Sequence, residues 1–245
     1  MIPLPFSKAE YQQRLGRVRE RMSALGMDLL ILTDVANQHY LTAYDGWSFY
    51  TPQVVVVTLE EDQPYWIGRA MDALGGKLTA WMDKDHVLGW PEDHVQTPDR
   101  HPMDWVANWI KTKGWGSRRI GIELEAYYYS PKAHARLTRG LPDARWIDAD
   151  LVVSWLRAKK SAAEIDYMRK GARLAEAAMR AAYETIAPGV VGSASGLNPS
   201  SGITPRPSAC AASARRSLPR LRASSAPTPP VCTVPHSPAQ IQRLS

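Results

Sequence analysis

The chain has 245 residues, with 30 Lys and Arg against 24 Asp and Glu, and a formal net charge of +6. The whole surplus lies in residues 191–245, which hold six Arg and no Asp, Glu or Lys, so residues 1–190 are neutral overall. These arginines are scattered among Ser and Pro without aromatic neighbours, so we expect no nucleic-acid binding. The longest apolar run, Val54–Leu59, is too short to cross a bilayer, and no cysteine precedes Cys210, so we expect neither a membrane span nor a disulfide framework in residues 1–190. We therefore expect a soluble, cytoplasmic protein.

Helices and strands alternate along residues 1–156. Apolar residues at intervals of three or four, together with capping residues and Pro or Gly at the ends, predict helices at 7–25, 72–81, 102–113, 131–141 and 149–156. Short apolar runs predict strands at 28–33, 54–59, 65–67, 86–88, 119–123 and 145–147. The acidic turn at 60–64 predicts an antiparallel hairpin, whereas helices separate the other strands. We therefore predict one α/β domain over residues 1–156, a mixed sheet flanked by helices; residues 37–50 fit neither period.

The most regular predicted element follows this domain. Ser161 and Glu164 have the spacing of a capping box, which predicts a helix that runs to about Ile186, before Pro188 and Gly189. Its apolar face needs a partner surface, so we expect residues 157–190 to be a linker and the first helix of a second domain. Residues 191–245 are low in complexity. They are either a disordered extension or the product of a frameshift, and the abrupt change in composition favours the frameshift.

The segment Arg157-x-x-Lys160-Ser161-x-x-Glu164-Ile165 resembles the junction of the creatinase/prolidase/Xaa-Pro aminopeptidase hydrolases, the M24 group. There it links an N-terminal α/β domain to a catalytic domain. Three further stretches are similar to the ectoine-hydrolase branch of that group: YDGWSFY at 44–50, RHPMD at 100–104 and YYYS at 127–130. The resemblance covers residues 7–190. It implies a creatinase-like N-terminal domain and, in the intact enzyme, hydrolysis of a C–N bond that opens ectoine to an acetylated diaminobutyrate.

The resemblance also implies a cofactor. In most members of the group two Asp, one His and two Glu of the second domain hold divalent metals, which make a nucleophilic hydroxide from water. Residues 191–245 contain no Asp or Glu, so no ligand position carries over. We therefore expect no catalytic residue and no metal ligand in this chain, which would be inactive alone. Two alternatives stay open: a fragment of a Xaa-Pro aminopeptidase-type metallopeptidase, and a non-catalytic dimerisation module.

Five residues are candidates for substrate contact, because the resemblance implies a homodimer in which the N-terminal domain of one subunit lines part of the active site of the other. Trp47, Phe49 and Tyr50 can stack on the amidinium of a small zwitterion. Arg69 can form a bidentate hydrogen bond with the carboxylate of this substrate, and His101 can orient the substrate or donate a hydrogen bond to it. Each also has a structural interpretation: interface aromatics, a surface arginine, and a histidine satisfied within a loop.

Other acidic residues give no complete site. Glu123 and Glu125 stand two apart at a strand end, and we expect a solvated rim there. Asp83, Asp85 and His86 lack the number of ligands and the supporting shell of a metal site.

Overall fold

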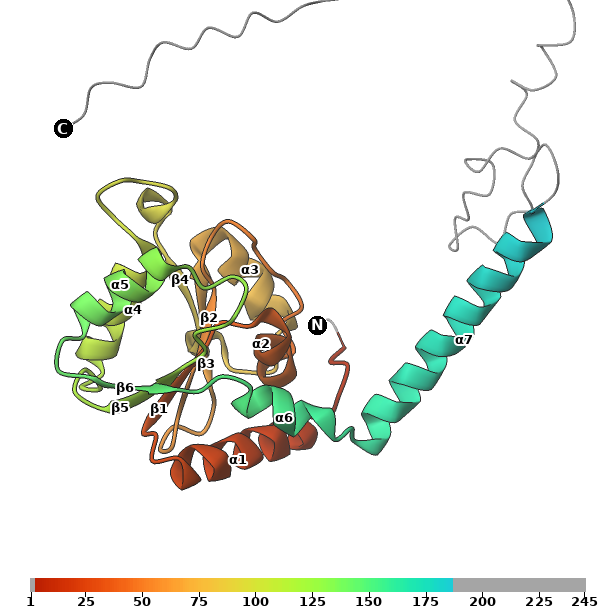
Figure 1. Ribbon diagram of the computed structural model, residues 1–245, viewed down its shortest axis with the longest axis horizontal. Helices are drawn as coiled ribbons and strands as arrows, with labels where there is room; N and C mark the ends of the chain where they lie inside the picture. The colour runs from red at the N-terminus through yellow and green to blue at the C-terminus, as the bar shows by residue number, and fades with distance from the viewer. Residues whose placement is uncertain (1–2, 187–245) are drawn as a thin grey trace, which may run out of the picture. The chain divides into compact units, whose positions relative to one another are not determined.

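The computed structural model describes residues 3–186, so the expectations for residues 191–245 lie outside the described part of the chain (Figure 1). Helices and strands alternate as predicted. The elements are α1 (Lys8–Ala24), β1 (Leu29–Leu32), α2 (Val35–Thr42), β2 (Val54–Thr58), β3 (Tyr65–Arg69), α3 (Ala70–Thr79), the short 3-10 turn η1 (Lys84–His86), β4 (Val87–Trp90), the 3-10 turn η2 (Glu92–His94), α4 (Pro102–Thr112), β5 (Arg119–Ile122), α5 (Pro131–Gly140), β6 (Arg145–Asp148), α6 (Val152–Ala158) and α7 (Ala162–Thr185).

The six strands form one mixed sheet in the order β4-β3-β2-β1-β5-β6. Only the contacts of β2 with β1 and β3 are antiparallel, and the other three pairs are parallel. The predicted hairpin and the mixed sheet are therefore confirmed. Five strands run in one direction, so β1, β3, β4, β5 and β6 all end at the same edge of the sheet, called the carboxyl edge below, where the loop before β2 also lies.

Helices cover both faces of the sheet (Figure 1). One core packs side chains of α1, α2, α3 and α6 against one face, including Trp66 and the completely buried Leu30. The second core packs α4 and α5 against the other face, including Ile31 and Trp90. Because successive strand residues point to opposite faces, a continuous apolar strand such as β1 serves both cores. This three-layer arrangement holds the strand ends in fixed positions.

The loop that fitted neither period contains a helix. Residues 35–42 form α2, and Asp34 caps it by accepting a hydrogen bond from Asn37 N at 2.9 Å. Asn37 and Gln38 are buried polar residues of this helix, so α2 has no apolar stripe from which a helical period can be recognised. The helix ends at Ala43, whose φ of 67° is left-handed. The following residues, 44–53, form the loop that leads into β2.

The junction between α6 and α7 is attached to α1. Ser161 and Glu164 form the predicted capping box, with Ser161 N donating to Glu164 Oε2 at 2.8 Å and Glu164 N to Ser161 Oγ at 3.2 Å. Ser161 Oγ also donates to Glu10 Oε1 at 2.7 Å. Buried Arg14 lies 3.2 Å from Glu164 Oε1 and stacks over the Phe6 ring at 4.2 Å. The junction motif therefore fixes the first turn of α7 to the domain.

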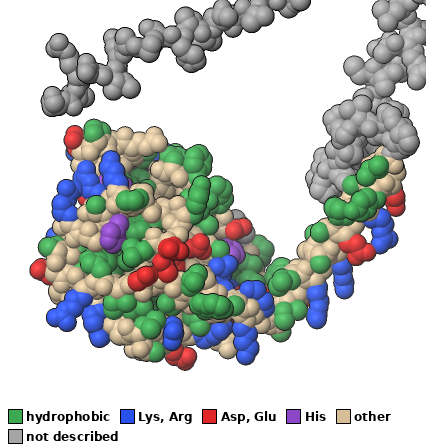
Figure 2. Space-filling view, viewed as in Figure 1, with side chains coloured by type: hydrophobic (Ala, Val, Ile, Leu, Met, Phe, Trp, Pro, Cys, Tyr) green, Lys and Arg blue, Asp and Glu red, His purple; other side chains and the backbone are tan. Residues whose placement is uncertain are grey.

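Along its whole length α7 has no buried residue. Hydrophobic side chains are exposed on it, and Lys and Arg side chains stand on its other side (Figure 2). No helix within residues 3–186 combines the length and the hydropathy that a membrane-spanning segment requires.

Candidate functional site

The carboxyl edge of the sheet holds all five residues predicted to contact substrate. Trp47, Phe49 and Tyr50 lie in the loop between α2 and β2, Arg69 is the last residue of β3, and His101 is the N-cap of α4. In α/β sheets ligands commonly bind outside the carboxyl ends of the strands. The fold therefore places the five candidates where this class of fold binds ligands, and their contact with substrate stays a prediction.

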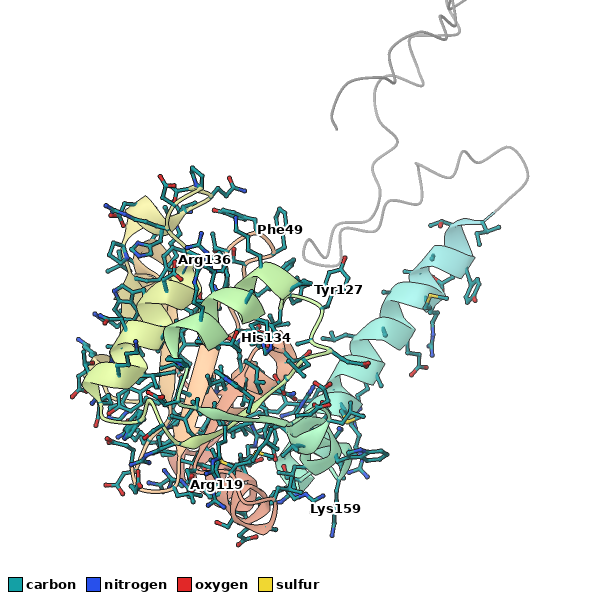
Figure 3. All side chains as sticks on the ribbon, turned by 60° about the vertical axis from the view of Figure 1, so that its left-hand side comes forward. Phe49, Arg119, Tyr127, His134, Arg136 and Lys159 are labelled. Carbon is teal, nitrogen blue, oxygen red and sulfur yellow. The ribbon has the colours of Figure 1, made fainter. Side chains whose placement is uncertain are left out.

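Two loops at this edge carry a row of five contacting aromatic rings, called the aromatic strip below. The ring centroids of Trp47 lie 6.2 Å from Phe49 and 5.6 Å from Tyr128, those of Phe49 and Tyr50 are 5.5 Å apart, and those of Tyr127 and Tyr128 are 5.1 Å apart. Phe49 is 75% and Tyr127 is 90% exposed, and both stand at the same end of the domain in Figure 3. Contiguous exposed apolar patches often serve as interaction sites, so the aromatic strip is a candidate binding surface.

The sequence shows the tyrosine pair of the strip only as part of the YYYS motif at 127–130 and gives no sign that Tyr128 lies beside Trp47. The two loops are about 80 residues apart in sequence. They come together because β1, which precedes the first loop, pairs with β5, which precedes the second.

Arg69 is already paired within the chain. Its Nε donates to Glu92 Oε1 at 3.0 Å and to Glu92 Oε2 at 2.8 Å, and Nη1 donates to the Tyr50 hydroxyl at 2.6 Å. The Glu92 hydrogen bond raises the pKa of Arg69, and the same bond lowers the pKa of Glu92. A substrate carboxylate at Arg69 would therefore compete with Glu92, and in this structure the guanidinium orients the strip through Tyr50.

His101 caps α4 through its side chain. Nδ1 accepts a hydrogen bond from Met103 N at 3.1 Å, while Asp104 Oδ2 accepts one from His101 N at 3.0 Å. Burial lowers the pKa of His101, so the ring is neutral near pH 7. Since Nδ1 accepts, the proton of the neutral ring is on Nε2. His101 thus caps α4 through Nδ1 and has an Nε2–H group available to donate a hydrogen bond.

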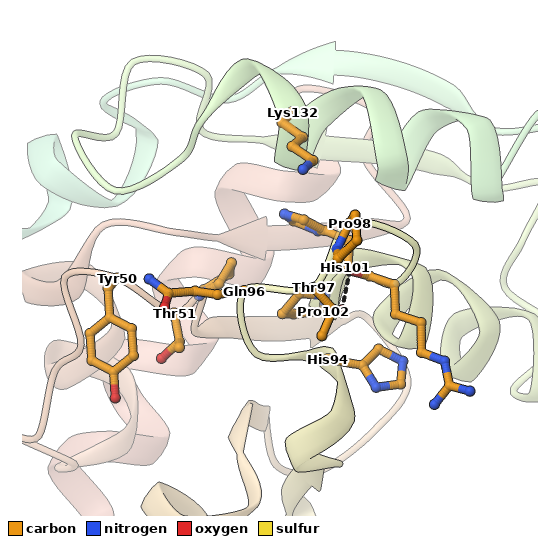
Figure 4. Close-up of a pocket in the computed structure, with 11 residues that line it drawn as sticks. Tyr50, Thr51, His94, Gln96, Thr97, Pro98, His101, Pro102 and Lys132 are labelled. Atoms are coloured by element: carbon orange, nitrogen blue, oxygen red, sulfur yellow. Dashed lines mark hydrogen bonds between the residues drawn. The ribbon is translucent and has the colours of Figure 1, made fainter.

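Two cavities lie at this end of the domain. The first has a volume of about 410 Å³, and Tyr50, His101 and Lys132 are among the residues that line it (Figure 4). The second has a volume of about 420 Å³ and is lined by Trp47, Arg157 and further aromatic and charged residues. Tyr50 and His101 are therefore brought to one cavity, and Trp47 to another.

Glu123 is the main residue of this edge that the sequence did not identify correctly. It is only 3% exposed, so the expectation of a solvated rim is wrong for Glu123. Its Oε2 accepts from Thr33 N at 2.7 Å and Asp34 N at 2.9 Å, and its Oε1 from Asn37 Nδ2 at 2.5 Å. Burial raises the pKa of Glu123 to about 7, against the lowering effect of these donors. The carboxyl group joins the ends of β1 and β5 to the start of α2.

Arg157, the first residue of the junction motif, extends this network. Its Nη1 donates to Asn37 Oδ1 at 2.8 Å and lies 3.9 Å from Asp34 Oδ1. The Asn37 amide therefore connects Arg157 to Glu123. Position 157 couples the domain junction to the carboxyl edge.

Within residues 3–186, no three His, Cys, Asp or Glu side chains are grouped so that they can hold a metal ion. The residues at the carboxyl edge can bind and orient a small molecule through ring faces, a neutral imidazole N–H and lysine or arginine charge. A divalent metal in the intact family enzyme stays a prediction.

Comparison with known proteins identifies the family. A model of the creatinase/prolidase N-terminal domain matches residues 14–159. The chain is 44% identical over 190 residues to ectoine hydrolase of Halomonas elongata, which covers 77% of this chain and 47% of that enzyme. It is 42% identical over 187 residues to an uncharacterized hydrolase/peptidase of Sinorhizobium fredii, covering 76% of this chain and 48% of the relative. The chain thus spans about half the length of these relatives.

A solved structure shows the same fold. The Xaa-Pro dipeptidase of Bacillus anthracis superposes with a TM-score of 0.58 at 20% identity, over 74% of this chain and 45% of that one. This likeness concerns the fold alone. From the matched domain and the sequence identity, the chain belongs to the creatinase/prolidase N-terminal domain family.

Proposed function

We propose that this chain acts as the N-terminal part of a cytoplasmic C–N hydrolase that opens the ring of ectoine to an acetylated diaminobutyrate. The observation that carries the proposal is the similarity to the Halomonas elongata ectoine hydrolase over most of the chain. The reaction itself would require a catalytic domain, with its divalent metals where the branch uses them.

In this proposal the carboxyl edge binds and orients the substrate across a homodimer. The aromatic strip offers ring faces to the cyclic amidinium, a delocalised cation of the kind that aromatic rings attract. The hydrogen bond from Arg69 Nη1 holds Tyr50 in its orientation. The buried carboxyl group of Glu123 receives three N–H donors, so it supports the geometry of the loops at this edge.

A chimera tests the proposal. Residues 1–186 are joined to the part of the Halomonas elongata enzyme that follows its matched region, and consumption of ectoine is followed by proton NMR. We expect turnover of ectoine, and Trp47→Ala should lower kcat/KM by about fivefold, because the loss of one cation–π contact costs about 1 kcal/mol. Leu25→Ala, a partly exposed residue after α1, is the matched control and should leave kcat/KM unchanged.

The same chimera separates the proposal from its alternatives. Release of the N-terminal residue from a Xaa-Pro dipeptide, without consumption of ectoine, would replace it with the peptidase function. A folded chimera whose ectoine turnover is the same with and without the Trp47 ring would contradict the role given to the aromatic strip. A chain that is a stable dimer without binding an apolar dye, and whose chimera is inactive on both substrates, would indicate the dimerisation module.

A further inference from the structure

The first cavity lies between three segments of the carboxyl edge. The loop 91–101, the start of α5 with Lys132, and the end of the aromatic loop at Tyr50 line it, and one side is open to solvent (Figure 4). Its volume of about 410 Å³ falls in the range of about 300 to 1,000 Å³ that is usual for small-molecule sites. The size fits a small molecule and not a folded partner.

The charged residues that line this cavity are of one sign. Two cationic residues, Arg100 and Lys132, and two histidines, His94 and His101, are among the residues that line it, and no Asp or Glu is. Asp93, outside the lining, pairs with Arg100, and its Oδ1 lies 2.7 Å from His94 Nδ1, as an acceptor of a hydrogen bond. The positive charge of the arginine is therefore compensated.

Lys132 is not compensated in this way. Within residues 3–186 its ammonium group forms no ion pair and no hydrogen bond, and it points from α5 toward the cavity in Figure 4. An ammonium group offers three donors and no acceptor. The cavity thus has an unpaired cation at its wall.

His101 adds a neutral donor to the same cavity. Its Nδ1 is occupied by Met103 N, so the Nε2–H group is the one left to bind a ligand, and no residue in the described part of the chain accepts from it. Lys132 lies close enough to His101 to act on it electrostatically. Two donor groups on different helices therefore meet at one cavity.

We propose that this cavity binds a small oxyanion, a carboxylate or a phosphate, between the ammonium group of Lys132 and the Nε2–H group of His101. Both oxyanions present two or more acceptor oxygens to such a pair, and charge-assisted hydrogen bonds are the stronger kind. A cation is disfavoured because no carboxylate lines the cavity. The inference does not depend on ectoine being the substrate, because binding is measured directly.

Calorimetric titration of the purified 245-residue chain tests the inference. Inorganic phosphate and acetate are the two probes, at pH 7.5 and constant ionic strength. We expect saturable binding of at least one of them, weakened about tenfold by Lys132→Gln, which removes a charge-assisted contact. Lys8→Gln, which removes the same charge from the exposed start of α1, should change the affinity less than about twofold, since screening weakens distant charges.

A second variant guards against loss of folding. His101→Asn removes Nε2–H but retains a side-chain oxygen that can cap α4, because Asn is a favoured N-cap residue. We expect weaker binding by this variant and an unchanged circular dichroism spectrum. Binding of acetate alone would identify a carboxylate site, and binding of phosphate alone a phosphate site. No saturable binding of either probe up to about 10 mM, or equal losses in the Lys8 and Lys132 variants, would overturn the inference.

Discussion

A carboxyl group joins strands β1 and β5 at each end, and the two carboxyl groups differ in burial and in the charge of their hydrogen-bond partners. At the amino end Asp28 accepts from Arg119 Nε at 3.0 Å and from Arg119 Nη2 at 2.7 Å, in a partly exposed ion pair. At the carboxyl end Glu123 is buried and accepts only from uncharged N–H donors. One pair of strands therefore provides both an exposed charged clamp and a buried polar one.

The two pKa shifts have opposite signs for this reason. The hydrogen bond from Arg119 lowers the pKa of Asp28 to about 2, whereas burial raises the pKa of Glu123 to about 7. A full charge partner in water contributes little to stability, but an unsatisfied polar group in the interior is costly. We therefore expect burial, and not the strength of the charge partner, to decide which end of the strand pair contributes more to stability.

Removal of the buried clamp has the largest expected effect. Glu123→Ala removes the acceptor of Thr33 N, of Asp34 N and of one of the two N–H groups of Asn37 Nδ2, the other of which can still donate to Ser154 Oγ, at a side chain that is only 3% exposed. We expect the free energy of unfolding at pH 5 to fall by about 4 kcal/mol, from about 1 to 3 kcal/mol for each orphaned group. Urea denaturation followed by near-UV circular dichroism measures it. Glu125→Ala, two residues on and exposed, is the control and should change stability by less than about 0.5 kcal/mol.

The pH dependence gives the next largest effect. Because the pKa of Glu123 is raised on folding, the folded chain holds a proton that the unfolded chain has lost between about pH 4.5 and 7. The free energy of unfolding should therefore fall as pH rises through this window, by about 2 to 3 kcal/mol. Glu123→Gln cannot titrate, so its stability relative to the natural chain should rise with pH. Parallel curves for the two proteins would mean that Glu123 is ionised at pH 5 in the folded chain.

Arg157 has a smaller expected effect, because its side chain is 31% exposed. Arg157→Gln removes the bond from Nη1 to Asn37 Oδ1 and should cost about 1 kcal/mol, the usual value of one hydrogen bond. Lys159→Gln, which removes a charge from an exposed position two residues away, should leave the urea midpoint unchanged. If the two variants were equally stable, the hydrogen bond from Arg157 to Asn37 would not contribute to the Glu123 network.

The positions of the strands, the antiparallel hairpin and the mixed character of the sheet were predictable from the sequence, whereas the order of the strands was not. Apolar runs and capping residues located nearly every element, and the acidic turn at 60–64 fixed the antiparallel hairpin. Helix α2 was not predicted, because Asn37 and Gln38 are polar and yet buried. Periodicity assumes that polar side chains face water, and it fails where a helix is covered on several sides.

The candidate site shows the same limit. Arg69 and His101 were candidates because of the family resemblance, and the structure places both at one edge of the sheet. The contact of Trp47 with Tyr128 needs the pairing of β1 with β5, which local sequence does not specify. The burial of Glu123 likewise depends on the start of α2, a helix that the sequence did not reveal.

The smallest expected effect tests the exposed clamp. Asp28→Asn keeps an oxygen that can accept from Arg119 N, which donates to Asp28 Oδ2 at 3.0 Å in the natural chain, but removes the charge. We expect a loss of about 0.5 to 1 kcal/mol at pH 7, because a partly exposed ion pair contributes little. Salt should reduce that loss, since mobile ions screen exposed charges.

The pKa of Asp28 is lowered on folding, so the stability from this pair is present above about pH 4 and is lost as the pH falls toward about 2. The free energies of unfolding of the natural chain and of Asp28→Asn should therefore converge as the pH falls to about 2. This stability is lost on acidification, whereas the stability that Glu123 contributes is lost as the pH rises. Stability measured in urea with and without about 0.5 M sodium chloride completes the test. A loss as large as that of Glu123→Ala, and insensitive to salt, would contradict the ranking of the two ends by burial.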